Sequence, residues 1–145
     1  MLSYEDVAGA AEWLVRVFGF REELRYEDSA GRAAHIELRL GDGAVMLGNP
    51  GPHYESPRHH RESCEAAARW SETPFVVDGV QAYVDDVDAH FARARESGVR
   101  ILSEVEDTPF GDRQYRVEDL EGHRWMFAQH VRGVPPDGSG ASSST

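Results

Sequence analysis

The sequence predicts an α+β domain made of two βαβββ modules that arose by internal duplication. An aspartate suited to capping a helix stands at Asp6, and again at Asp86 in the second half of the chain. Strand-like stretches follow each helix in the same order, and a long polar connection separates the halves. We expect module 1 at about 1–48, the connection at 49–77 and module 2 at about 78–131.

Both predicted helices show apolar residues at helical spacing and end before a glycine, Gly19 in the first and Gly98 in the second. The apolar positions are Val7, Ala11, Leu14 and Phe18 in the first helix and Val87, Phe91 and Ala94 in the second. Each helix should therefore pack one face against its own sheet.

The predicted strands are 2–4, 20–26, 33–40 and 44–47 in module 1, and 80–84, 99–105, 112–117 and 124–128 in module 2. Gly41-Asp42-Gly43 is expected to be a hairpin turn rather than a phosphate loop, because no helix follows it. A module with one helix covers one sheet face only, so two open faces can enclose a cleft for a small molecule.

Length and composition limit the function classes. A chain of 145 residues and 16.2 kDa is about one domain. A net charge of -11 disfavours nucleic acid as a partner, and no apolar run is long enough for a membrane span. Cys64 is the single cysteine, which excludes an intrachain disulfide and favours the cytoplasm. The Gly- and Ser-rich residues 132–145 are expected to form a flexible tail.

The connection carries His53, His59 and His60 near Cys64, with a helical piece expected around 62–70. Their spacing matches no established zinc pattern, so a solvated loop is the favoured interpretation.

Alternation on strand 33–40 places His35 and Glu37 on one face and the apolar side chains on the other. If the apolar side packs under the helix, this pair lines the cleft and could act as an acid–base pair. The alternative is a solvated face of an edge strand. Tyr115 is as far along the chain from His35 as Asp86 is from Asp6, so the duplication predicts that it faces the same cleft.

Further ligand-contacting candidates are Met46, Gln81, Tyr83 and Met126. Trp125 and Met126 must point to opposite faces of a strand, so we expect Trp125 beneath the helices. The two methionines are either plain core residues or an apolar, adaptable cleft wall suited to a flat organic ligand.

Three segments resemble the vicinal oxygen chelate superfamily, which includes glyoxalases, ring-cleaving dioxygenases and bleomycin-resistance proteins. They are Val-Asp-Asp-Val-Asp-Ala at 84–89, Phe-Gly-Asp-Arg at 110–113 and Glu-Gly-His-Arg-Trp-Met-Phe at 121–127. The resemblance covers about residues 1–131 and implies the glyoxalase/bleomycin-resistance fold.

Metal enzymes of that superfamily place a His on the first strand and a Glu on the last strand of each half. The corresponding positions here are Gly79, Met46 and Met126, and the first-half His position precedes Met1. Glycine offers no donor and thioether sulfur coordinates hard divalent ions weakly. The resemblance therefore implies that the family's metal site is absent, and no cofactor is expected.

Two functions stay open. The favoured one is metal-independent binding of a small organic molecule, such as an antibiotic or toxic metabolite, by a homodimer. The alternative is a lyase or isomerase that uses His35 and Glu37, with or without a divalent metal.

Overall fold

The computed structural model describes residues 1–73 and 79–131. Two predicted segments lie outside the described residues. They are the flexible tail at 132–145 and the end of the connection, at 74–77.

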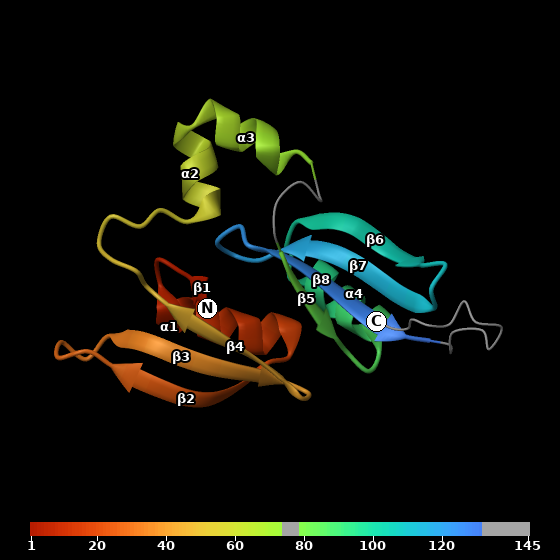
Figure 1. Cartoon of the computed structure of the whole chain (residues 1–145), viewed down its shortest axis with the longest axis horizontal. Coiled ribbons are helices and arrows are strands. Elements are labelled where there is room, and N and C mark those ends of the chain that lie inside the picture. Colours follow the sequence, from red (N-terminus) through yellow and green to blue (C-terminus); the bar gives the residue numbers. More distant parts are fainter. Residues whose placement is uncertain (74–78, 132–145) are drawn as a thin grey trace.

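Module 1 forms a four-stranded sheet in the order β1-β4-β3-β2, and module 2 repeats it as β5-β8-β7-β6 (Figure 1). The first module contains β1 (Leu2–Ser3), α1 (Val7–Trp13), the π-helical turn η1 (Leu14–Phe18), β2 (Arg21–Glu27), β3 (Ala33–Leu40) and β4 (Gly43–Gly48). The second contains β5 (Val80–Tyr83), α4 (Val87–Glu96), β6 (Ile101–Asp107), β7 (Asp112–Glu118) and β8 (Arg124–His130). The predicted duplication and fold class are confirmed.

Both helices begin as the sequence predicts. The carboxylates of Asp6 and Asp86 accept hydrogen bonds from the backbone N–H groups of Gly9 and Ala89, at 3.0 and 3.1 Å. The glycines after the helices, at 19 and 98, have φ of 82° and 83°, a left-handed conformation that glycine adopts without strain. The first helix differs from the second because its last turn, η1, is π-helical.

The two modules differ in the length of one hairpin turn. In module 1 Leu40 pairs with Gly43, so the turn consists of Gly41 and Asp42. In module 2 the N–H of Asp119 donates to the carbonyl of His123 at 2.8 Å, so the equivalent turn spans 120–122 and is longer by a single residue. Corresponding positions of the two modules therefore differ in residue number by one less on β7 than on β8.

One core joins the modules. Each sheet carries its helix on the face turned away from the viewer in Figure 1, and α4 also packs against η1. Large aromatic side chains from both modules meet there with less than 2% exposure, namely Tyr4, Phe18, Tyr115, Trp125 and Phe127. Trp125 lies beneath the helices, as alternation predicts. The open faces of the sheets are left outside the core.

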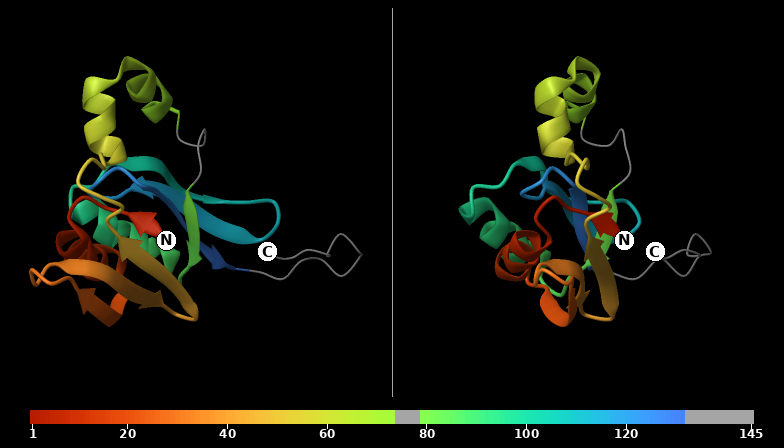
Figure 2. Two further views of the ribbon diagram at one scale, coloured as in Figure 1. Left: turned by 60° about the vertical axis from the view of Figure 1, so that its left-hand side comes forward. Right: turned by 90° about the vertical axis from the view of Figure 1, so that its left-hand side faces the viewer.

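The connection folds into two short helices, α2 (Pro57–Ser63) and α3 (Glu65–Ser71), where the sequence predicts a loop with one helical piece at 62–70. Ser56 caps α2 by accepting from the N–H of His59 at 3.2 Å, and Pro57 occupies the first helical position. Figure 2 shows both helices standing above the two modules. Among the described residues, no helix is long and apolar enough to cross a membrane.

Candidate functional site

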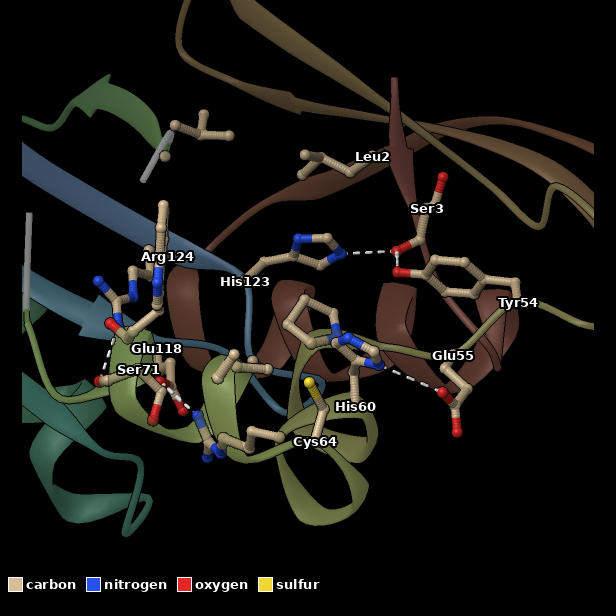
Figure 3. Close-up of a pocket in the computed structure, with 18 of the residues that line it drawn as sticks. Leu2, Ser3, Tyr54, Glu55, His60, Cys64, Ser71, Glu118, His123 and Arg124 are labelled. Carbon is tan, nitrogen blue, oxygen red and sulfur yellow. Dashed lines mark hydrogen bonds and ion pairs between the residues drawn. The ribbon is translucent and has the colours of Figure 1, made fainter. Parts of the chain in front are cut away.

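A pocket of about 850 Å³ lies between the α2–α3 pair and the first strands of the two sheets (Figure 3). We call residues 57–71, which cover it, the helical cap. Its apolar lining comes from both sides and includes Leu2, Val80, Pro57, Ala66, Ala67 and Trp70. Polar groups reach it from Tyr54, His60, Cys64, Glu118, His123 and Arg124. This volume and this mixture suit a small organic molecule.

Glu5 fastens the cap to module 1. Its carboxylate accepts from the N–H of Ser56 at 2.7 Å and contacts Nδ1 of His59 at 2.9 Å. These hydrogen bonds, that of Ser56 foremost, lower the pKa of Glu5, and the bond to Glu5 raises the pKa of His59. The Tyr54 hydroxyl adds a hydrogen bond to the carbonyl of Ser3 at 2.9 Å.

Glu118 fastens the cap to module 2. Its carboxylate is 2% exposed and accepts from Arg61 of the cap at 2.8 Å and from Arg100 of the sheet module at 2.9 Å. Arg124 donates to the carbonyl of Ser71 at 2.7 Å, at the end of α3. Burial lowers the pKa of Arg124, although the Glu118 charge acts in the opposite direction.

The hairpin that carries Glu118 and Arg124 is held by Asp119, which is 3% exposed. One carboxylate oxygen accepts from the Tyr4 hydroxyl at 2.5 Å and from Trp125 Nε1 at 3.0 Å. The other accepts from the N–H groups of Glu121 and His123, both at 3.0 Å. Burial and the Asp119 charge raise the pKa of Tyr4, so the phenol stays protonated and donates.

Gly122, in the same turn, is required by close packing. Its φ is 94°, and a Cβ there would come within 2.7 Å of the Arg58 backbone nitrogen at the start of α2. The Arg58 N–H donates to the carbonyl of Glu121 at 2.9 Å. The turn and the cap therefore fit each other backbone to backbone.

The predicted ligand-contacting residues of module 1, namely His35, Glu37 and Met46, lie on the open face of its sheet. His35 Nε2 and Glu37 Oε2 are 3.5 Å apart, and both side chains are partly buried. Met46 pairs with Glu37 across the strands and is 44% exposed. None of the three lines the 850 Å³ pocket.

Gln81, Tyr83 and Met126 lie on the open face of the module 2 sheet. Gln81 pairs with Met126 in the parallel ladder, and its Nε2 lies 3.4 Å from the Tyr83 hydroxyl. That hydroxyl donates to the buried carboxylate of Asp112 at 2.9 Å, which His130 also contacts at 2.9 Å. None of these three residues lines the 850 Å³ pocket, although Gln81 directly follows Val80, which does.

The prediction that Tyr115 faces the same cleft as His35 is wrong. Tyr115 is 0% exposed, and its hydroxyl donates to Nδ1 of His90 on α4 at 2.6 Å. It therefore lies on the helix side of β7. With the smaller offset that holds on β7, Tyr115 corresponds to the buried Ile36. Burial raises the pKa of Tyr115.

The positions that correspond to the family's metal ligands do not fit a hard divalent ion. Met46 and Met126 offer only thioether sulfur. A Cβ at Gly79 would come within 2.9 Å of the Arg124 carbonyl oxygen, so a histidine there would require the backbone to move. Within residues 1–73 and 79–131, no three His, Cys, Asp or Glu side chains are grouped so that they could hold a metal ion.

Sequence reasoning predicted a helical piece at 62–70, which overlaps α3, but it missed α2 and the residues that anchor the cap. His59 and His60 are exposed, as expected, but they lie on α2 rather than in a loop, and His59 contacts Glu5. Ser56-Pro57 was an available signal, because serine followed by proline is typical of a helix start. No sequence signal pairs Arg61 with Glu118, since the two residues are 57 positions apart.

Comparisons place these features in a known family. The model of the Glyoxalase/Bleomycin resistance protein/Dioxygenase superfamily matches residues 1–127. The uncharacterized protein Rv0887c of Mycobacterium tuberculosis is 32% identical over 148 residues, covering 99% of this chain and 80% of that protein. The crystal structure of TioX from Micromonospora sp. ML1 is 37% identical, covers 92% of this chain and 95% of TioX, and superposes with a TM-score of 0.66. TnmS3 from Streptomyces sp. CB03234, an antibiotic binding protein, shares the fold at 22% identity and a TM-score of 0.61, over 90% of this chain and 93% of TnmS3. The chain belongs to the glyoxalase/bleomycin resistance protein/dioxygenase superfamily.

Proposed function

We propose that this protein binds a small organic molecule, without a metal ion, in the pocket beneath the helical cap. The observation that carries the proposal is the pocket itself, about 850 Å³ with aliphatic and aromatic walls and a few polar groups. Trp70, 57% exposed, offers an aromatic face for a flat ligand. Sequestration of an antibiotic or toxic metabolite is the role we favour, in the cytoplasm, and TnmS3 is an instance of this fold in an antibiotic binding protein.

A thermal-shift screen of the purified protein against antibiotics, aldehydes and divalent ions tests this function. A ligand at about 100 times its Kd should stabilise the fold by about 2.7 kcal/mol. Quenching of Trp70 fluorescence should accompany binding, and Trp70→Phe should remove most of that signal while Trp13→Phe keeps it.

Two neighbouring alanines on α3 locate the site. Ala67 lines the pocket and Ala68 does not, so Ala67→Phe should fill the pocket and weaken binding at least about tenfold, whereas Ala68→Phe should not. Equal affinity of the two variants for the ligand would show that the ligand binds outside this pocket.

A second candidate function rests on the 3.5 Å contact between His35 and Glu37. A carboxylate beside an imidazole can orient it for proton transfer, as a lyase or isomerase requires. In that case His35→Ala should cut turnover by roughly two to four orders of magnitude and leave binding unchanged. Mass analysis of the ligand after incubation separates this outcome from binding alone, in which the ligand is recovered intact.

A further inference from the structure

The helical cap is attached to the rest of the protein by polar contacts. Across residues 57–71, all of which the structure describes, neither α2 nor α3 contains a buried side chain. Each helix is seven residues long, too short to be stable on its own. Segments with little apolar burial open at a lower free energy than the sheets beneath them.

The contacts at the two margins of the cap are hydrogen bonds and ion pairs between named polar groups. On the module 1 side, Glu5 binds Ser56 and His59. On the module 2 side, Arg61 forms the ion pair with Glu118, and the Arg58 N–H donates to the carbonyl of Glu121. The end of α3 is held there by Arg124 and Arg100, which both donate to the carbonyl of Ser71. Figure 3 shows the pocket, with His60 and Cys64 on the cap side and His123 and Arg124 on the sheet side.

Glu118 has two arginine partners, and the second one lowers the free energy needed to break its ion pair with Arg61. An unpaired carboxylate buried at 2% exposure would be strongly unfavourable. Arg100 of module 2, just before β6, also binds Glu118 at 2.9 Å. Opening of the cap would break its hydrogen bond to the carbonyl of Ser71 but not its ion pair with Glu118. Glu118 therefore keeps a charged partner in both positions of the cap.

We propose that the helical cap is a lid that opens as a unit, with the Arg61–Glu118 ion pair as its latch, and admits the ligand to the pocket. The role of the lid in admitting a ligand rests on the proposed function. The opening itself is a property of the protein without ligand. A molecule in the pocket would touch Trp70 and Ala67 of the lid and Leu2 and Val80 of the sheets at once. Binding would thus favour the closed position.

Hydrogen-exchange mass spectrometry on the full chain, without ligand, tests the lid. Amides of α2 and α3 should be protected yet exchange together, well before those of β7 and β8. Arg61→Leu should speed exchange in the cap by roughly 10- to 100-fold, the effect of losing one charge-assisted hydrogen bond, and leave β7 and β8 unchanged.

Arg69→Leu is the matched control, because the ion pair that Arg69 forms among the described residues stays within α3, with Glu65 at 3.7 Å, and both side chains are exposed. The substitution removes the same charge from the cap and should leave exchange within about twofold of the unmodified chain. Glu5→Gln tests the other margin and should also speed exchange in α2.

Three results would overturn the lid. They are cap amides that exchange only with global unfolding, cap amides with no protection at all in the unmodified chain, and equal effects of Arg61→Leu and Arg69→Leu. None of these results depends on a ligand, so a lid that fails is distinguishable from a pocket that binds nothing in the thermal-shift screen.

Discussion

Replacing Asp119 by asparagine should lower the free energy of unfolding by about 2 to 4 kcal/mol, although the two side chains have nearly the same shape. Asp119 accepts four hydrogen bonds from groups of both modules, two on each carboxylate oxygen. Asparagine has one carbonyl oxygen and can serve two of the four donors.

The magnitude follows from what each donor can do. The N–H groups of Glu121 and His123 are fixed by the turn, so the asparagine oxygen should stay with them. The amide NH₂ then faces Tyr4, whose hydroxyl can rotate and accept, and Trp125, whose indole N–H cannot. One buried N–H left without an acceptor costs about 1 to 3 kcal/mol, and the remaining bonds lose their charge.

Urea denaturation followed by tryptophan fluorescence measures the change, and thermal unfolding should show a Tm lowered by about 7 to 14 °C. Tyr4→Phe removes one bond only and should cost about half as much. Asp42→Asn makes the same chemical change in the exposed turn of the equivalent hairpin and should shift stability by less than about 0.5 kcal/mol. A loss below about 1 kcal/mol for Asp119→Asn would refute the claim that this carboxylate joins the modules.

Three further predictions concern pH, metal and assembly. Burial lowers the pKa of His90, whose Nε2 donates to the Phe18 carbonyl at 2.8 Å. At His90 the unfolded chain therefore takes up a proton first, so the contribution of His90 to stability should fall as pH drops below about 6.5, by up to about 1.4 kcal/mol per pH unit. The raised pKa of the exposed His59 acts in the opposite direction. His90→Gln should remove this contribution from the pH profile, and an unchanged slope would contradict a partly buried His90 that is neutral in the folded protein. Elemental analysis of protein purified without chelators should find well under one equivalent of Ni, Zn, Mn or Fe, whereas a stoichiometric metal that EDTA removes would contradict metal-free binding. Light scattering at micromolar concentration should give about twice 16.2 kDa, because association would cover the open sheet faces, and a clean monomer would count against the dimer.

The elements of the fold were predictable because local chemistry specifies them. Asp6 and Asp86 cap the helices, glycines end them, and strand alternation sorts Trp125 from Met126. These signals act over a few residues, so they can be recognised without knowledge of the tertiary structure.

The orientation of Tyr115 was not predictable from a constant offset between the modules. A single additional residue in the turn between β7 and β8 makes the offset on β7 smaller by one, and such a shift moves a side chain to the other face of a strand. Only the register of the paired strands shows where the additional residue lies.

The pocket was not predictable for a different reason. It depends on the docking of a polar segment whose contacts are far apart in sequence, such as Arg61 with Glu118 and Ser56 with Glu5. Such a segment lacks the apolar periodicity that identifies core elements.

The first strands of both modules line the pocket, but the parts that complete it are those in which the two modules differ. The helical cap has no counterpart in either module, and the hairpin that supplies Glu118 and Arg124 is the one with the additional residue. Buried residues of the repeated frame, such as Ile36 and Val117, hold the sheets against the helices, so their substitution should change stability. Substitution of Trp70, which is more than half exposed, should instead change ligand affinity with little effect on stability. Under the proposed function, the cap and one hairpin would set the choice of ligand, and the duplicated frame would set the stability of the fold.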